Sequence, residues 1–289
     1  NQQYNSKREG SSIGTTLSYT EPVGKHSMIE LNYNYSYSKN QSDRFTYNFD
    51  STAKEYIIPD SLLTNTYNDS YQSNRVSLNY RIQKENFNIS FGSGVQFGTQ
   101  TSENTSKHIL IKQQYTNLYP SANLNYKFSK STNLRFFYNG RTAQPSVGQL
   151  QPVADNSDPL NIRLGNPSLK QSFTNSGRLL FTSFNSSNMH NIFASINAGF
   201  IQNNIVNATT TILSTGVDTV RPVNMNGAYN LSASFNYGFP LKNPKSNLNF
   251  GTNFFDNRSV GLITTLDSAT AKDPLTKRNI TTNYGFSES

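Results

Sequence analysis

The sequence lacks cysteine, and only 15% of its residues are charged. Without cysteine it has no disulfide framework, no cysteine-based zinc site and no thiol nucleophile. It also lacks the run of about 18 apolar residues that a membrane-spanning helix needs, and its first ten residues have no apolar core like that of a signal peptide. The chain is therefore either soluble or meets a membrane in another way.

Aromatic and uncharged polar residues are abundant instead. The 289 residues include 17 Tyr and 19 Phe although only 34% are hydrophobic. Disordered chains have few aromatic residues and strong charge, so this composition favours β-strands, which tyrosine, phenylalanine and threonine prefer. The net charge of +8 is spread along the chain without a dense basic run, and nothing indicates a nucleic-acid partner.

Apolar and polar residues alternate in segment after segment. Between Tyr229 and Phe239 the odd positions are aromatic or aliphatic and the even positions are small or polar, so an extended chain presents one face of each kind. Helical periodicity is absent. The pattern predicts about eleven strands, near residues 12–20, 26–38, 74–83, 86–101, 116–129, 132–141, 173–186, 190–203, 227–239, 246–257 and 278–287.

The connections between these strands alternate in length. Short turns are expected at 21–25, 83–85, 129–131, 186–190 and 240–246. Long loops are expected near 39–73, 101–115, 142–172, 204–226 and 258–277. In an antiparallel up-and-down sheet, this alternation places all the short turns at one end. Outer-membrane barrels have short periplasmic turns and long extracellular loops, whereas the Greek-key connections of a soluble sandwich follow no such rule.

The predicted fold is therefore all-β: an antiparallel up-and-down transmembrane β-barrel with its apolar residues toward lipid and its polar residues toward a watery lumen. An odd number of strands in an unclosed sheet would leave edges without hydrogen-bond partners in lipid. We therefore expect residues 1–289 to form a single partial barrel domain, an internal piece of a barrel of about 22 strands. The expected location is the outer membrane of a Gram-negative bacterium.

The most distinctive short motifs lie between residues 118 and 172. They are Tyr119-Pro120-Ser121, Phe128-Ser129-Lys130, Arg141-Thr142 with Pro145-Ser146, Gln149-Leu150-Gln151-Pro152, Asp158-Pro159-Leu160 and Gly165-Asn166-Pro167-Ser168-Leu169-Lys170. As a set they resemble the barrel of Bacteroidetes-type TonB-dependent outer-membrane receptors and related outer-membrane β-barrel proteins. The resemblance implies a barrel of about 22 strands that is plugged by a globular domain and takes up a scarce ligand with energy relayed by TonB. This sequence contains neither the plug nor the TonB-contacting box.

The resemblance also implies partners and a contact region. The implied partners are outer-membrane lipid and lipopolysaccharide, the plug domain, the TonB system and a substrate-binding partner at the surface. The loop at 142–172 could fold over the mouth of the barrel, because binding surfaces often lie on loops held by a rigid scaffold. The candidate residues for contact with ligand or plug are Arg141, Gln149, Asp155, Asp158, Arg163 and Asn166. The alternative is that this loop, rich in proline and glycine, is shaped for folding alone.

Charged residues at polar strand positions form a second group of candidates. The five that would face the lumen are Glu30, Arg75, Arg81, Lys127 and Arg135. In the lumen they avoid hydrocarbon, and they either pair within the wall and with a plug or recognise a ligand. Gly92 and Gly94 indicate a place where other atoms closely approach one strand.

No motif of catalytic chemistry is present. His26, His108 and His190 lie far apart, none with a second histidine at metal-ligand spacing, and there is no nucleophile elbow or phosphate-binding loop. We expect no catalysis, no metal site and no cofactor in this segment. Three functions remain open: a receptor barrel for uptake, a non-transporting outer-membrane barrel with a structural, adhesion or assembly role, and a soluble secreted β-sandwich.

Overall fold

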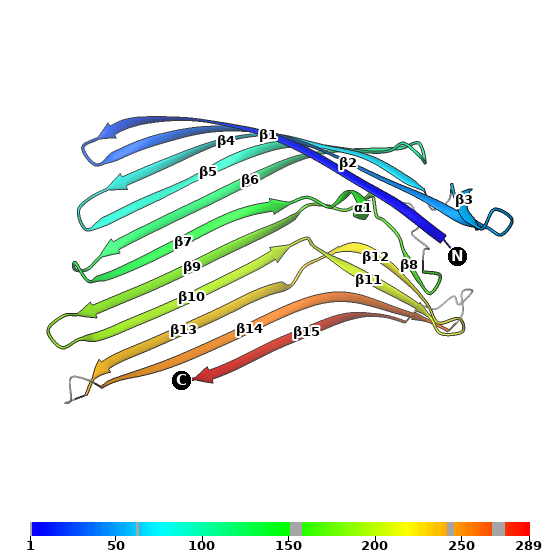
Figure 1. Ribbon diagram of the computed structural model, residues 1–289. Helices are drawn as coiled ribbons and strands as arrows, with labels where there is room; N and C mark the ends of the chain where they lie inside the picture. Colours follow the sequence, from blue (N-terminus) through cyan, green and yellow to red (C-terminus); the bar gives the residue numbers. More distant parts are fainter. Residues whose placement is uncertain (1, 62–63, 151–157, 242–245, 268–274) are drawn as a thin grey trace.

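The computed structural model describes residues 2–61, 64–150, 158–241, 246–267 and 275–289. Eleven principal strands form one curved antiparallel sheet (Figure 1). In spatial order they are β1 (Gln2–Gly24), β2 (Ser27–Asp50), β4 (Asn65–Gln83), β5 (Phe87–Asn104), β6 (Ile109–Lys127), β7 (Thr132–Ala143), β9 (Ser172–Asn185), β10 (His190–Gln202), β13 (Ala228–Pro240), β14 (Asn247–Leu266) and β15 (Leu275–Glu288). Each corresponds to one predicted segment, so the antiparallel up-and-down architecture is confirmed.

The two ends of the sheet differ. Few residues separate β1 from β2, β4 from β5, β6 from β7, β9 from β10 and β13 from β14, and the strand ends at these links lie at the left end in Figure 1. The right end carries the additional elements of the longer connections. Within the described residues β1 and β15 are not paired with each other, so the sheet is an open, curved wall.

Several strands run further than the alternating pattern indicates. β2 continues to Asp50, β4 begins at Asn65, and only residues 105–108 separate β5 from β6. Much of 39–73 and 101–115, expected as loop, is therefore strand. Consecutive residues there are often polar on both faces, so the backbone ladder continues where the apolar signal ends. These strand extensions are called the collar, which comprises residues 2–11, 39–50, 65–73, 101–104 and 109–115.

The long connections also contain four strands and a helix that the pattern did not predict. They are β3 (Glu55–Pro59), β8 (Asn161–Arg163), β11 (Asn204–Ile212), β12 (Val217–Met225) and α1 (Val147–Leu150). β3 pairs with the outer part of β2, while β11 runs parallel to the end of β14 and β12 joins β11 to β8. No helix in the described part of the chain is long and apolar enough to cross a membrane.

The strand register divides the sheet into two faces. One row of cross-strand partners is apolar on nine consecutive strands: Ile82, Ile89, Leu124, Phe136, Leu179, Ile196, Ala233, Phe254 and Phe286. A row on the opposite side crosses all eleven strands with small or polar residues: Thr20, Glu30, Asn79, Gly92, Ser121, Asn139, Ser176, Gly199, Asn230, Asn257 and Asn283. These sides are called the apolar face and the polar face.

Among the residues that the structure describes, no second layer covers the apolar face. In the described residues the buried hydrophobic side chains are limited to Leu150, Leu169, Ala228 and Val260. By contrast, Leu78 exposes 54% of its surface and Ile196 exposes 47%. A β-sandwich would bury such a face against another sheet, and soluble monomers rarely leave so extensive an apolar surface in water. The face therefore requires an apolar environment.

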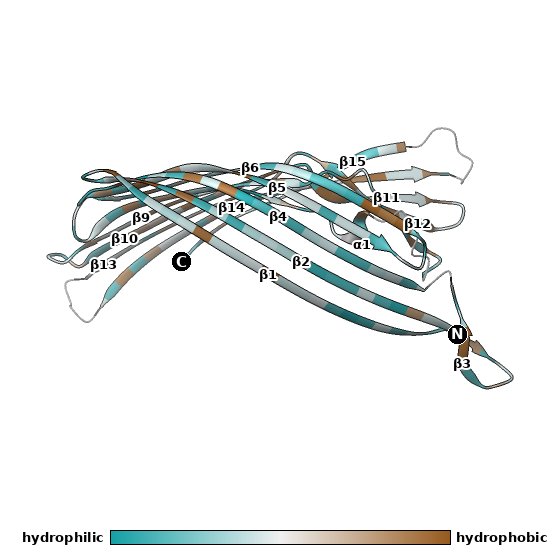
Figure 2. Ribbon diagram, turned by 90° about the horizontal axis from the view of Figure 1, so that it is seen from above, coloured by the Kyte–Doolittle hydropathy of each residue, from teal (hydrophilic) through white to brown (hydrophobic). Residues whose placement is uncertain are grey.

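The wall is uneven in height. β1 and β2 have 23 and 24 residues, whereas β7 and β10 have 12 and 13. About 9–11 tilted residues suffice to cross a bilayer, so the strands on the β1 side extend beyond it. Figure 2 shows hydrophilic colours along the ends of β1 and β2 near the N-terminus. The collar is thus a mostly polar extension of one side of the wall.

Candidate ligand-contact site on the polar face

A hollow of about 380 Å³ opens on the polar face above β5. On β5 the polar-face residues next to the hollow are Gly92 and Gly94, which have no side chains to fill it. A Cβ atom on Gly94 would lie 2.8 Å from Cβ of Ser77 and 2.9 Å from the carbonyl oxygen of Val76. The close approach predicted from these glycines is confirmed, and their lack of side chains leaves room for the hollow.

Two of the predicted arginines line this hollow, one from the lumen-facing charges and one from the candidates for ligand or plug contact. Arg75 on β4 and Arg141 on β7 both line it, together with Tyr119 of β6. The guanidinium carbon of Arg75 lies 5.2 Å from the centre of the Tyr119 ring. The Tyr119 hydroxyl is hydrogen-bonded to Gln96 and to Thr142, which fixes the ring beneath the arginine.

A network of tyrosine and glutamine side chains continues from the hollow into the collar. The Tyr71 hydroxyl accepts hydrogen bonds from Nε2 of Gln96 at 3.2 Å and from Nε2 of Gln144 at 2.6 Å. Farther out, the Tyr115 hydroxyl donates to Oε1 of Gln100 at 3.1 Å. Sequence reasoning missed this network, although tyrosine and glutamine at alternate positions of neighbouring strands were a readable signal.

The described parts of the connection from β7 to β9 contact the polar face. Nε2 of Gln100 donates to the Pro145 carbonyl at 3.2 Å, and Nε2 of Gln113 donates to the Pro167 carbonyl at 2.7 Å. Leu150 of this connection is fully buried. The carbonyls of Pro145 and Pro167 thus accept hydrogen bonds from side chains of β5 and β6, which anchors both ends of the connection on the polar side of the sheet.

Three of the predicted contact residues come together beside a second hollow of about 470 Å³. Gln149 and Arg163 line it. Asn166 lies next to them, because its backbone N–H donates to the Gln149 carbonyl at 2.6 Å. The Asn166 side chain is buried and donates to the Pro222 carbonyl of β12 at 2.8 Å. Asn166 therefore joins the connection to the β11–β12 hairpin.

The predicted aspartates do not join this group. Asp158 is exposed and caps the turn before β8, accepting hydrogen bonds from the Asn161 side chain at 2.7 Å and from the Leu160 backbone N–H at 3.0 Å. These donors hold the pKa of the Asp158 carboxyl below its usual value. Asp155 lies outside the described residues.

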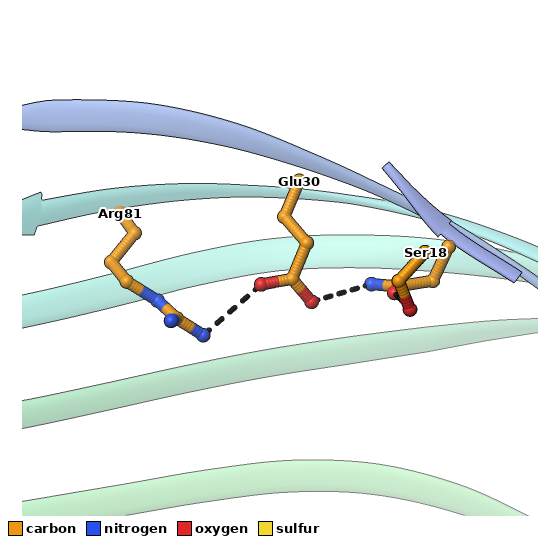
Figure 3. Close-up of polar contacts among 4 residues, drawn as sticks. Ser18, Glu30 and Arg81 are labelled. Carbon is orange, nitrogen blue, oxygen red and sulfur yellow. Dashed lines mark hydrogen bonds and ion pairs between the residues drawn. The ribbon is translucent and has the colours of Figure 1, made fainter. Parts of the chain in front are cut away.

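The register places all the predicted lumen-facing charges on the polar face: Glu30, Arg75, Arg81, Lys127 and Arg135. Arg81 and Glu30 form an ion pair at 3.1 Å, and the same carboxylate accepts a hydrogen bond from Asn32, which in turn accepts one from Ser18 (Figure 3). This chain of contacts joins β1, β2 and β4, so for this pair the wall-stabilising interpretation accounts for the geometry.

Apolar side chains interrupt the polar face near its short-turn end. Phe137 on β7 lies opposite Arg178 on β9, and Leu180 is two residues after Arg178. On β10 the partner of Leu180 is Ser195, and Phe193 is two residues before Ser195. Such diagonal neighbours are within contact distance of large side chains. These residues, Phe137, Leu180 and Phe193, are called the interior apolar patch.

The described residues contain no group of three side chains suited to holding a metal ion. His190 contacts a ring instead, with its Nδ1 2.6 Å from the Tyr237 hydroxyl. In the described residues the polar face carries hydrogen-bond donors and acceptors, and guanidinium groups that form no ion pair, such as those of Arg75 and Arg141. These groups are suited to binding a ligand.

Comparison with known proteins agrees with this geometry. The model of the outer membrane protein beta-barrel family matches residues 1–287. No curated protein matches the chain. Among solved structures, the Serratia marcescens hemophore receptor HasR, a double mutant in complex with its hemophore HasA and heme, has a TM-score of 0.60 at 9% identity over 99% of this chain and 49% of HasR. The copper transporter OprC has a TM-score of 0.57 at 11% identity over 88% of this chain and 38% of OprC. The chain spans less than half the length of either structure.

Proposed function

The chain belongs to the outer membrane protein β-barrel family, and we propose that it forms part of a plugged, TonB-dependent receptor that takes up a scarce ligand. The family establishes a location in the outer membrane of a Gram-negative bacterium, and the soluble sandwich is therefore wrong. Lipid covers the apolar face, and lipopolysaccharide is the expected neighbour in the outer leaflet. We assign no catalysis to this segment.

The interior apolar patch is the observation that carries this proposal. Phe137 exposes 44% of its surface and Phe193 exposes 37%, both on the polar face. A water-filled pore would keep these rings hydrated, at about 25 cal/mol for each Å² of apolar surface. A globular plug seated in the lumen would bury them. The patch therefore favours a filled barrel over an open pore.

The connection between β7 and β9 supports the same proposal. It turns toward the polar face and is fixed there by Gln100 and Gln113, so it narrows the space that a solute would cross. The ligand would meet Gln149 and Arg163 around the second hollow, and the buried Asn166 would hold the connection beside it. HasR binds a hemophore and heme, and OprC is a copper transporter; we propose no particular ligand for this chain.

The test follows the access of one polar-face residue in living cells. Asn123 is exposed and lies opposite Phe137, whereas its neighbour Leu124 belongs to the apolar row. Because this segment has no cysteine, Asn123→Cys and Leu124→Cys each add one thiol to it. Each variant of the full-length protein is labelled with a small hydrophilic maleimide, with and without a protonophore that collapses the inner-membrane proton gradient.

Energised movement of a plug should expose Asn123→Cys several-fold faster in untreated cells than in protonophore-treated cells. Leu124→Cys should react slowly in both, because it faces lipid. Fast labelling of Asn123→Cys under both conditions, together with ion conductance by the purified protein in a planar bilayer, would refute the proposal. That result would favour the non-transporting barrel with a structural, adhesion or assembly role.

A further inference from the structure

We propose that Arg75 and Arg141 form one oxyanion-binding site on the inner wall, which accepts a carboxylate or phosphate group. The site requires only the polar face of the barrel and does not depend on energised uptake. It lies over four neighbouring strands: β4 and β7 supply the arginines and β6 supplies Tyr119. On β5, which runs between β4 and β6, the neighbouring polar-face residues are Gly92 and Gly94.

The lining of the hollow is chemically one-sided. Besides the two arginines, its polar side chains are Ser77, Asn79, Tyr119, Ser121 and Asn139. Ser77, Asn79, Ser121 and Asn139 can each donate a hydrogen bond, whereas the Tyr119 hydroxyl already donates to Gln96. No carboxylate lines the hollow, so two positive charges point into a space whose other polar groups are neutral. Such a site repels cations and attracts anions.

Neither Arg75 nor Arg141 forms an ion pair in the described part of the chain, whereas Arg81 on the same face is neutralised by Glu30 at 3.1 Å. Along β4 the next acidic residue on the polar face is Asp69, six residues from Arg75, which corresponds to about 20 Å of strand. The two guanidinium groups are therefore available to a group that is not part of this wall.

The geometry around Arg75 is preorganised. Its guanidinium carbon lies 5.2 Å from the Tyr119 ring centre, a stacking contact that holds the guanidinium plane while its N–H groups stay free. Tyr119 is itself held by Gln96 and Thr142. A planar fork of N–H donors matches the two oxygens of a carboxylate or phosphate, and the second arginine can bind the same group from β7.

The anion can come from a free ligand or from an acidic side chain of a plug, since both present the same oxygens. The direct test uses citrate and pyrophosphate as probes in calorimetric titrations of the purified full-length protein in detergent. Arg75→Gln and Arg141→Gln are compared with Arg135→Gln. This control removes an arginine of the same strand and face as Arg141 that does not line the hollow.

For a free anion, the unaltered protein should bind a probe, and each of Arg75→Gln and Arg141→Gln should weaken binding at least tenfold, because charge-assisted hydrogen bonds contribute that much or more. Arg135→Gln should bind normally. Unchanged heat-dependent mobility in electrophoresis would show that all variants are folded. If Arg135→Gln weakens binding as much as the others, the effect is one of general charge and the proposal is wrong.

For an acid supplied by a plug, the unaltered protein should bind neither probe, because the site is filled. Maleimide labelling of Ser77→Cys, inside the hollow, should then be several-fold faster in the Arg75→Gln and Arg141→Gln backgrounds than in the Arg135→Gln background. Absence of probe binding combined with equal labelling rates would overturn the proposal. Neither arm requires a proton gradient, so failure here is distinct from failure of the uptake function.

Discussion

Moving one arginine by a single residue along β13 tests the assignment of the two faces. Phe235 is 47% exposed on the apolar face, where its cross-strand partners are Ala194 and Thr252. Asn236, the next residue, is also exposed but lies on the polar face. Phe235→Arg and Asn236→Arg therefore introduce the same side chain at almost the same height, on opposite sides of the wall.

The depth of Phe235 sets the magnitude of the effect. Pro240, at the short-turn end of β13, lies five positions along the strand from it. At about 3.3 Å per residue and a tilt of about 40°, it lies about 13 Å above that end, near the middle of an apolar band about 25 Å tall. An arginine at the midplane of a barrel wall destabilises it by about 2–4 kcal/mol, which is roughly 30- to 900-fold in the folding equilibrium.

The assay is guanidinium-dependent folding of the full-length protein into phospholipid vesicles, followed by its heat-dependent electrophoretic mobility. Phe235→Arg should lower the folded fraction at every denaturant concentration, whereas Asn236→Arg should stay within about 0.5 kcal/mol of the unaltered protein, as a surface substitution does. Equal destabilisation by both substitutions, or a larger effect at Asn236, would refute the assignment of lipid to the apolar face.

Three further predictions address packing, the inward connection and pH. The added Cβ of Gly92→Ala would overlap the backbone of the neighbouring strand, so this variant should destabilise the barrel by about 1–3 kcal/mol. In Gly177→Ala the atom nearest to the added Cβ is 4.0 Å away, so this variant should be tolerated in the same folding assay. Asn166→Ala removes a buried hydrogen bond and should lower stability by about 1–3 kcal/mol and speed proteolysis of the connection; unchanged proteolysis would contradict its anchoring role. Because the Asp158 pKa is lower in the folded chain, its turn is stabilised above the unfolded pKa and loses that support as pH falls through the folded value; Asp158→Asn should abolish this pH dependence in hydrogen exchange of the turn at Asn161.

The sequence was sufficient to predict the wall because lipid on one side and water on the other impose strict alternation. The row from Ile82 to Phe286 is the result of that constraint, and the short turns supplied the strand order. The same reasoning underestimated the collar. There neither face has to be apolar, so sequence alternation is no longer required although the backbone ladder persists.

The candidate site was harder to predict, because it depends on register between strands distant in sequence. Arg75 and Arg141 are 66 residues apart (141 − 75), and only the pairing of β4 through β7 brings them to one hollow. Adjacent apolar pairs such as Phe136 and Phe137 weakened the strand pattern. The structure explains them, since Phe137 belongs to the interior apolar patch.

The collar has a consequence for the order of assembly. Register in a sheet is set where one face must be apolar, because a slip of one residue would reverse every side chain. Residues 39–44 are all polar, so a slipped pairing there would expose the same kind of surface as the native one. The membrane part of β2 must therefore fix the register first. Pairing of the collar then propagates outward from strands that are already aligned. Collar residues that hold no other segment are consequently free to vary, whereas Gln113, which donates to the Pro167 carbonyl, is not.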